Sequence, residues 1–250
     1  MATTSETGHS KNVANFDQLI STIVGYGPDY NPTKNSLKPE SLQSTSVNAK
    51  KAIDAVNETL PVYNNAIAAR EMAFGPLSKL ATRIMNALKA TDTPAPVIDN
   101  ALTFVRKLQG RRANPKKTEE EKNALLARGV KVKERSASQM GYNNRIDTFD
   151  RLIKLLISLP QYTPNETDLQ NASLLALLND LKAKNEAAVA ATTPLSNARL
   201  SRNNILYSEN SGLVDTAMNS KAYIKSLFGA TSPQYKLVTI LTFKNLKIVH

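Results

Sequence analysis

The chain contains one pattern twice, and this internal repeat constrains its fold more than any other feature of the sequence. Four short motifs of the first half recur in the same order in the second half, with small changes in the spacing between them. The matched pairs are Phe16-Asp17-x-Leu19-Ile20 with Phe149-Asp150-x-Leu152-Ile153, Tyr30-x-Pro32 with Tyr162-x-Pro164, Asn65-Ala66-x-x-x-Arg70 with Asn197-Ala198-x-x-x-Arg202, and Leu102-Thr103-Phe104 with Leu241-Thr242-Phe243. The repeat predicts a duplicated structural unit.

The composition indicates that the duplicated unit is helical. Hydrophobic residues make up 41% of the 250 residues, which is enough to bury a substantial core, but aromatic residues make up only 6% and tryptophan is absent. The apolar residues are mostly Ala, Leu, Ile and Val, which suit the packing of helix on helix. We therefore predict an all-α, internally duplicated helical bundle with two long antiparallel helices, elongated and pseudo-twofold.

Each copy begins with an amphipathic helix around Phe16 or Phe149 and continues into a longer second helix. The long helix of the first copy carries a heptad seam typical of a coiled coil. Its members are Ala49, Ile53, Val56, Leu60, Tyr63, Ile67, Arg70 and Phe74. Pro61 and Pro194 fall inside the long helices. Because proline removes a backbone hydrogen bond, we expect a bend or a short break at both.

Turn signals predict where the later helices begin and end. Gly75-Pro76 and Ser211-Gly212 are expected to interrupt the long helices, and Ser232-Pro233 is a start signal for the last one. Residues 237–249 are also rich in strand-forming residues, so helix and strand both remain open there. We predict a disordered tail over 1–12, repeats over 13–110 and 143–250 packed as one domain, and a basic connector with a short helix over 111–142.

Positive charge is concentrated where the two copies join. The formal net charge is +11, and residues 106–135 hold eleven basic and four acidic residues, whereas residues 16–105 hold eight of each. The candidates for contact with an anionic partner are Arg106, Lys107, Arg111, Arg112, Lys116 and Lys117. Thr118 and the three glutamates after it predict a short capped helix that ends at Gly129.

Two interpretations of this basic segment stay open. Clustered arginine and lysine side chains bind nucleic acid or a ribosome by displacing counterions from phosphates, and they also attract acidic proteins. The other interpretation is a solvated connector that its charges keep soluble. It is favoured because the run is short, has no interleaved aromatic residues and matches no nucleic-acid-binding motif.

The sequence offers few groups for chemistry. Cysteine is absent, and the two histidines, His9 and His250, are expected to lie in tails. We therefore expect no catalytic residue, no cofactor and no metal site. The first residues lack the pattern of a signal peptide, and no long apolar run follows, so we expect a cytoplasmic protein without a membrane span.

Three pairs of polar residues recur at equivalent positions of the two copies. They are Asp17 and Asp150, Arg70 and Arg202, and Asn65 and Asn197. An enzyme interpretation makes the aspartates a two-carboxylate site between the copies. The structural interpretation predicts that Arg70 or Arg202 bonds to one of the aspartates or to a helix C-terminus, because an arginine on an apolar seam needs a partner. The asparagines are expected to bond across a helix contact or to cap a helical segment.

The repeated motifs and the closing stretch resemble those of a group of uncharacterised all-helical proteins of Bacteroidetes-type bacteria. The closing stretch is Lys225-Ser226-Leu227-Phe228-Gly229-Ala230-x-Ser232-Pro233-Gln234-Tyr235-Lys236. The resemblance covers most of the chain. It implies a bacterial origin, and it implies no mechanism because the group carries no known activity.

These observations together predict a non-enzymatic structural or interaction protein that acts through a protein partner or through self-association. The leading alternative is a nucleic-acid-binding or ribosome-associated protein that uses the basic segment 106–135. A small-ligand or enzyme site between the repeats is the second alternative, and it requires a pocket there.

Overall fold

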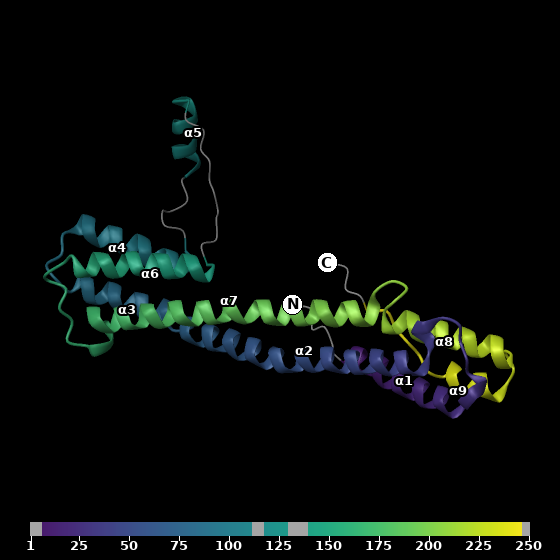
Figure 1. The fold of residues 1–250 in the computed structure, drawn as a ribbon. Helices are drawn as coiled ribbons and strands as arrows, with labels where there is room; N and C mark the ends of the chain where they lie inside the picture. The colour runs from purple at the N-terminus through teal and green to yellow at the C-terminus, as the bar shows by residue number, and fades with distance from the viewer. Residues whose placement is uncertain (1–6, 112–117, 130–139, 247–250) are drawn as a thin grey trace. The chain divides into compact units, whose positions relative to one another are not determined.

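A computed structural model describes residues 7–111, 118–129 and 140–246 of the chain. Within these ranges the protein is all-helical and contains no strand, as the composition predicts (Figure 1). The chain divides into two compact units. Unit 1 combines residues 1–64 with residues 191–250, and unit 2 spans residues 65–190.

The described helices follow one another along the chain in a fixed order. The α-helices are α1 (Thr7–Gly25), α2 (Pro39–Phe74), α3 (Leu77–Lys89), α4 (Ala95–Leu108), α5 (Glu119–Ala127), α6 (Tyr142–Ile157), α7 (Asn171–Tyr207), α8 (Leu213–Phe228) and α9 (Pro233–Thr239). The short 3-10 helices are η1 (Gly27–Asp29), η2 (Asn35–Leu37) and η3 (Thr167–Leu169). The short helix predicted after Thr118 is α5, and Gly129 beyond it has a φ of 73°.

The first helix begins earlier than the sequence predicts. A disordered tail over residues 1–12 is wrong for its last six residues, because α1 starts at Thr7 and already buries His9 and Asn12. Both polar side chains find partners near the other end of the chain. His9 Nδ1 lies 2.6 Å from the hydroxyl of Tyr207, and Asn12 bonds to the backbone of Lys244. Residues 7–12 are ordered by these distant partners.

Both long helices continue through their internal prolines. α2 includes Pro61 and α7 includes Pro194 without an interruption, so the expected short break is absent at both. A proline removes one backbone hydrogen bond, and the flanking turns of so long a helix keep theirs. The helices end instead at the next signals, α2 before Gly75-Pro76 and α7 shortly before Gly212, as predicted.

The seam predicted along α2 is buried only near its ends. Ala49 and Val56 are buried, as is Phe74 in the last turn. Leu60 and Ile67 in the middle are partly exposed. The predicted seam is therefore buried as far as Val56 and again at Phe74, but the spacing overestimates how deeply residues 60–70 are covered.

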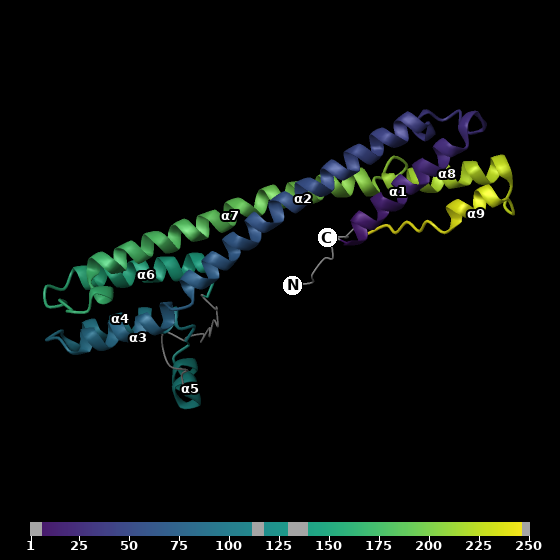
Figure 2. The ribbon, with the colours of Figure 1, turned by 90° about the horizontal axis from the view of Figure 1, so that it is seen from below.

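Unit 1 has its core between α1, α8 and α9, which pack together (Figure 2). Phe16 and Leu19 of α1 are fully buried and share this core with Leu213 and Ile224 of α8. The short helix α9 starts as predicted, because the Ser232 hydroxyl accepts a hydrogen bond from the Tyr235 amide at 3.1 Å. Such a cap satisfies an amide that the first turn would otherwise leave open.

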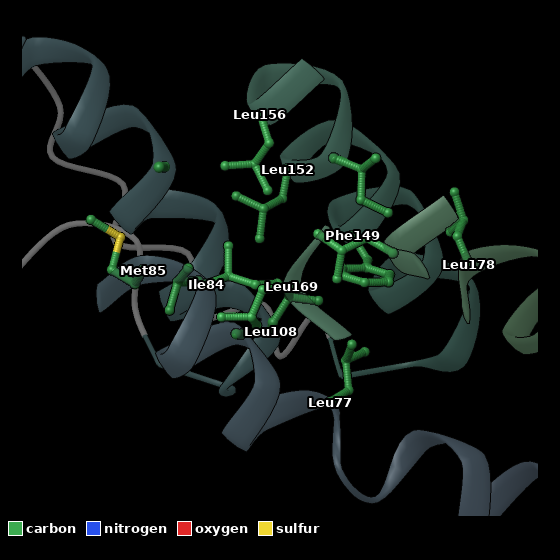
Figure 3. Packing of buried hydrophobic residues seen from close by; sticks show 14 of the residues in the cluster. Leu77, Ile84, Met85, Leu108, Phe149, Leu152, Leu156, Leu169 and Leu178 are labelled. Atoms are coloured by element: carbon green, nitrogen blue, oxygen red, sulfur yellow. The ribbon is translucent and has the colours of Figure 1, made fainter. Parts of the chain in front are cut away.

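Unit 2 has a separate core between α3, α4, α6 and the start of α7 (Figure 3). Phe149 of α6 is fully buried and lies among Leu77 of α3, Leu108 of α4 and Leu178 of α7. Phe16 and Phe149 thus occupy the centres of different cores, each near the middle of its helix. The repeated motif Phe-Asp-x-Leu-Ile therefore contributes a fully buried phenylalanine to the core of each unit.

Of the residues 237–249, for which helix and strand were left open, 237–239 belong to α9, 241–246 take neither form, and 247–249 lie outside the described residues. The helix ends at Thr239, and residues 241–246 run as an extended segment that pairs with no strand among the described residues. We call residues 241–246 the C-terminal strap. Its first residue, Leu241, is buried in the core of unit 1.

Side chains of unit 1 take the place of a neighbouring strand along the strap. The amide of Asn12 donates to the carbonyl of Lys244 at 2.7 Å and accepts from the Lys244 amide at 3.1 Å. Asn15 donates to the carbonyl of Thr242 at 2.7 Å, and Lys221 Nζ donates to the carbonyl of Leu241 at 3.0 Å. The backbone groups of an extended segment need partners, and here polar side chains of α1 and α8 provide them.

The two compact units do not follow the predicted repeat boundaries. Unit 1 holds the first helix of the first copy together with the last helices of the second copy, and unit 2 holds the reverse combination. The prediction of one domain made of two repeats differs from this division. The physical reason is the length of α2 and α7, because each helix extends past the core in which it begins and contributes to both units.

Candidate functional site

The repeated arginine of the first copy stacks on an aromatic side chain in unit 2. The guanidinium carbon of Arg70 lies 4.0 Å from the centre of the Tyr142 ring, and that ring meets Phe74 edge to face at 4.9 Å. Arg70 Nη1 also donates a long hydrogen bond of 3.4 Å to Asn185, whose own amide bonds to Asn143 at 2.8 Å. A cation over an aromatic face is stabilised by the charge distribution of the ring.

A second arginine, which the sequence did not single out, lies beside the same aromatic pair. Arg145 of α6 donates to the carbonyl of Phe74 at 2.7 Å, in the last turn of α2, and its guanidinium lies 5.0 Å from the Phe74 ring. Burial lowers the pKa of Arg145. A bond from an arginine to a helix C-terminus was predicted, but Arg145 makes it in place of Arg70. A guanidinium there also complements the helix dipole.

Unit 1 holds the other repeated arginine, Arg202, and an aromatic pair of its own. Arg202 is buried, with 2% of its surface exposed, and donates to the side-chain oxygen of Asn203 at 2.8 Å. Near the end of α7 the ring of Tyr207 lies 5.6 Å from the ring of His9. His9 precedes Phe16 by the same spacing that separates Tyr142 from Phe149. His9 is therefore a core residue, and the expectation that it lies in a tail is wrong.

The repeated aspartates are held by neighbours in their own units. Asp17 accepts from the Ser46 hydroxyl and pairs with Lys50 at 2.8 Å, both on α2. Asp150 pairs with Lys154 of its own helix at 2.6 Å. Among the described contacts, neither aspartate bonds to Arg70 or Arg202. The predicted arginine–aspartate link is thus absent from the contacts that the structure describes.

The repeated asparagines do not make the contacts predicted for them. Asn65 and Asn197 are exposed side chains inside continuous helices, so they cap no helical segment. Their neighbours Ala66 and Ala198 are partly buried. The structure explains the repeat of this motif through its arginine and gives no role to its asparagine.

The basic candidates divide between described and undescribed residues. Arg106 and Lys107 lie in the last turn of α4, where cations complement the negative end of a helix, and Arg111 follows as an exposed residue. Arg112, Lys116 and Lys117 lie outside the described residues. The sequence therefore located the basic end of α4, but not the cations of other helices that join it.

The end of α4 lies against the start of α6. α4 and α6 pack along each other (Figure 1). Phe104 and Lys107 of α4 line a small groove of about 140 Å³ with Asn144, Asp147, Thr148 and Arg151 of α6. Just after α4, the space beside Gly110 is filled by the sulfur of Met140, which comes shortly before α6. This contact brings Arg106, Lys107 and Arg111 to the same end of unit 2 as Arg145.

Most cations elsewhere in unit 2 have a carboxylate within reach, whereas Arg70 and Arg145 do not. Arg83 pairs with Asp168, and Arg151 pairs with Asp147 at 3.1 Å. Arg70 and Arg145 contact aromatic rings, an amide and a backbone carbonyl, and each keeps a buried Nε atom without a partner in the described part of the chain. We call the set of Arg70, Arg106, Lys107, Arg111 and Arg145 the basic end of unit 2.

Two larger grooves lie elsewhere, one in each unit. The groove of unit 1 measures about 580 Å³ and is lined by small and polar residues such as Thr45, Ala52 and Ser201. The groove of unit 2 measures about 620 Å³ and lies around Tyr162, with Asn86 and Glu166 on its walls. In the described ranges, no group of three or more histidine, cysteine, aspartate or glutamate residues could hold a metal ion.

Tyr162 makes the same hydrogen bond in unit 2 that Tyr30 makes in unit 1. The Tyr162 hydroxyl donates to the carbonyl of Leu169 at 3.1 Å, and the Tyr30 hydroxyl donates to the carbonyl of Leu37 at 3.0 Å. Burial raises the pKa of Tyr162 to about 12, with a further contribution from the nearby carboxylates of Glu166 and Asp168. Each tyrosine thereby ties a 3-10 helix to the turn before it.

The raised pKa of Tyr162 predicts a loss of stability in alkali. Above pH 10 the tyrosine ionises in the unfolded chain but stays protonated in the folded protein until about pH 12, so the free energy of unfolding falls across this range. Tyr162→Phe should make that fall shallower, as measured by denaturant unfolding at pH 9, 10 and 11. Tyr223→Phe is the control, and an equal effect of both substitutions would contradict the assignment.

Comparison with protein-family models, with curated protein sequences and with solved structures finds no match to this chain. None of the helices in the described ranges combines the length and the apolar character needed to cross a membrane.

Proposed function

We propose that this chain is a non-enzymatic helical interaction protein, that it arose by internal duplication, and that it acts by contact with protein, including a second copy of itself. The observation that carries the proposal is that the repeated polar residues are used to hold helices together. Tyr30 and Tyr162 each donate a hydrogen bond to the backbone carbonyl of the residue seven positions later in the sequence. Arg70 lies between aromatic and amide side chains of its own unit. Residues repeated for such a purpose are typical of a scaffold.

The order of elements supports the duplication. A first helix, a 3-10 segment of two short helices in the first copy and one in the second, a long helix with an internal proline, and two shorter helices follow one another in each copy. Arg70 near the end of α2 meets Asn185 in the first half of α7, which supports an antiparallel arrangement of the two long helices within unit 2. The proposed duplication would place equivalent anchors, Phe16 and Phe149, in the two cores.

Sedimentation velocity over a wide range of protein concentration tests self-association directly. Contact through apolar side chains should strengthen in sulfate salts, because excluded salts favour burial of apolar surface. A sedimentation coefficient that stays that of a monomer at every concentration, with and without sulfate, would contradict self-association.

Substitution of the two repeated aspartates separates the interaction protein from an enzyme. Asp17→Asn and Asp150→Asn remove one exposed ion pair each, so we expect each to change the free energy of unfolding by less than about 1 kcal/mol and to leave association unchanged. Lys50→Met and Lys154→Met are the matched controls for loss of the ion pairs. Loss of association in both aspartate variants but in neither lysine variant would oppose the proposal, because it would show that the carboxylates themselves are needed.

A further inference from the structure

Helices α3 and α8 bury their side chains at the same spacing, so each position of one helix has an equivalent in the other. Three matched pairs lie 136 positions apart (213 − 77), and all six residues are buried: Leu77 with Leu213, Ala81 with Ala217, and Leu88 with Ile224. Two helices that bury matched positions also direct their other matched positions alike. In this register, Ala87 of α3 is the equivalent of Tyr223 of α8.

In unit 1 this position holds an aromatic ring that packs on the repeated tyrosine. The ring of Tyr223 meets the ring of Tyr30 edge to face, with the ring centres 5.2 Å apart and the ring planes at 87°. Edge-to-face contact is a favoured arrangement of two aromatic rings. α8 also packs against η2, which contains Leu37, the hydrogen-bond partner of Tyr30. Tyr223 therefore belongs to the packing around Tyr30.

In unit 2 the equivalent position holds only a methyl group, and a groove lies beside it. The groove of about 620 Å³ is lined by Ala87, by the repeated tyrosine Tyr162 and by Leu169, the hydrogen-bond partner of Tyr162. Its volume is within the range of about 300–1,000 Å³ that is typical of small-ligand sites. Unit 2 thus has a groove on the side of its repeated tyrosine where unit 1 has an aromatic side chain.

We propose that this groove binds an aromatic ring that carries a hydroxyl group, as the side chain of tyrosine does. The bound ring takes the place beside Tyr162 that Tyr223 holds beside Tyr30. Such a ring comes either from a free phenol or from a tyrosine of a partner protein, and both present the same chemical group. This inference goes beyond the proposed function, because the groove can bind a phenol whether or not the chain associates with itself.

Polar side chains on the walls of the groove fit the hydroxyl group of the ligand. Asn86, Gln161 and Asn165 line the groove, and each side-chain amide can both donate and accept a hydrogen bond. Ligand sites typically combine an apolar surface with a few polar groups that fix the orientation of the ligand. Ala87 and Leu169 provide the apolar surface here.

The charges on the walls select against a ligand with a negative group. Asp92 and Glu166 line the groove, and Arg83 beside them is already paired with Asp168. A carboxylate on the ligand would meet two like charges and an arginine that is engaged elsewhere. We therefore expect a neutral phenol to bind more tightly than its carboxylated analogue.

The test titrates the isotope-labelled full chain with para-cresol, which is the side chain of tyrosine, and follows the amide signals by NMR. The amides of Asn86, Ala87 and Asn165 should shift, and para-hydroxybenzoate should shift them less. Ala87→Tyr should abolish these shifts, because its ring would fill the groove as Tyr223 fills the equivalent place in unit 1. Ala68→Tyr is the matched control, because Ala68 is an exposed residue of α2, and it should keep the shifts.

A second probe, a blocked pentapeptide with one central tyrosine, distinguishes the two sources of the ring. Tighter binding of para-cresol would support a free phenol as the ligand, and tighter binding of the peptide would support a tyrosine of a protein.

A second variant, Tyr223→Ala, tests the proposal without filling the groove. It removes the ring from unit 1, so para-cresol should then also shift the amide signals of Tyr30 and Leu37. Circular dichroism checks that each variant keeps its helices. The absence of shifts with both probes in the parent protein, shifts only at residues outside the groove, or equal binding by the Ala87→Tyr and Ala68→Tyr variants would overturn the proposal.

Discussion

Replacing Phe149 with alanine lowers the free energy of unfolding by about 3–5 kcal/mol, because the substitution opens a cavity in a closed core. Phe149 has no exposed surface and lies among side chains of α3, α4 and α7 in unit 2 (Figure 3). Three separate helices would have to move to fill the space. The surrounding structure relaxes only in part after such a change, so the lost contacts are not recovered.

Urea unfolding followed by circular dichroism measures this loss for Phe149→Ala. Ile157→Ala is the control on the same helix, because half of the Ile157 side chain is already exposed and its removal leaves no closed cavity. Hydrogen exchange should become faster in α4 and α6 of the Phe149 variant. A loss no larger than that of the control would show that Phe149 is not the anchor of unit 2.

Replacing Asn12 with alanine lowers the free energy of unfolding by about 2–3 kcal/mol, because it leaves buried groups without partners. The Asn12 side chain is buried and makes both hydrogen bonds to the backbone of Lys244. It also donates to the hydroxyl of Tyr207 at 3.3 Å. Alanine satisfies none of these groups.

Hydrogen exchange of the C-terminal strap reports this loss most directly. The amide of Lys244 should exchange much faster in Asn12→Ala, because its acceptor is the removed side chain. Asn15→Ala is the matched control. It removes one exposed hydrogen bond to Thr242, so it should cost only about 0.5–1 kcal/mol. Unchanged exchange at Lys244 in the Asn12 variant would contradict this account of the strap.

Local signals in the sequence predicted the helix boundaries well. Gly75-Pro76, Gly212 and Ser232-Pro233 act within a few residues of themselves, and the helices begin or end where these signals stand. At the internal prolines a bend or a short break was predicted, and the short break is absent. Pro61 removes one backbone hydrogen bond of α2. The helix stays continuous because its remaining hydrogen bonds and the packing of its two ends in the cores of the two units stabilise it.

Partners far apart in the sequence could not be predicted in the same way. His9 and Asn12 looked like part of a polar tail, and their burial depends on Tyr207 and Lys244, which lie near the other end of the chain. Arg145 stands outside the basic segment 106–135 and no local pattern singles it out, and only the fold shows that it reaches the end of α2. One sequence signal was available for His9. It stands at the position of Tyr142 when Phe16 is aligned with Phe149.

Only some residues of the basic end of unit 2 could be predicted from the sequence. The charge of residues 106–117 is a local property, so Arg106, Lys107 and Arg111 could be named in advance. The contribution of α6 depends on the packing of α4 against it, which no local pattern contains. The repeated aspartates attracted attention because they recur, although their contacts are short-range ion pairs with lysines of the neighbouring turn or helix.

The division into units sets an order in which the protein can form as it leaves the ribosome. Unit 2 is one continuous stretch, residues 65–190, so all of its partners are available once that stretch has emerged. Unit 1 joins residues from both ends of the chain, and α1 finds α8 only after synthesis has passed residue 228. Until then α1 can pack only on the part of its core that α2 provides, which includes Leu42 and Ala49. α1 therefore lacks its contacts with α8 during the synthesis of everything between the two helices, and nascent-chain chaperones can meet it throughout that time.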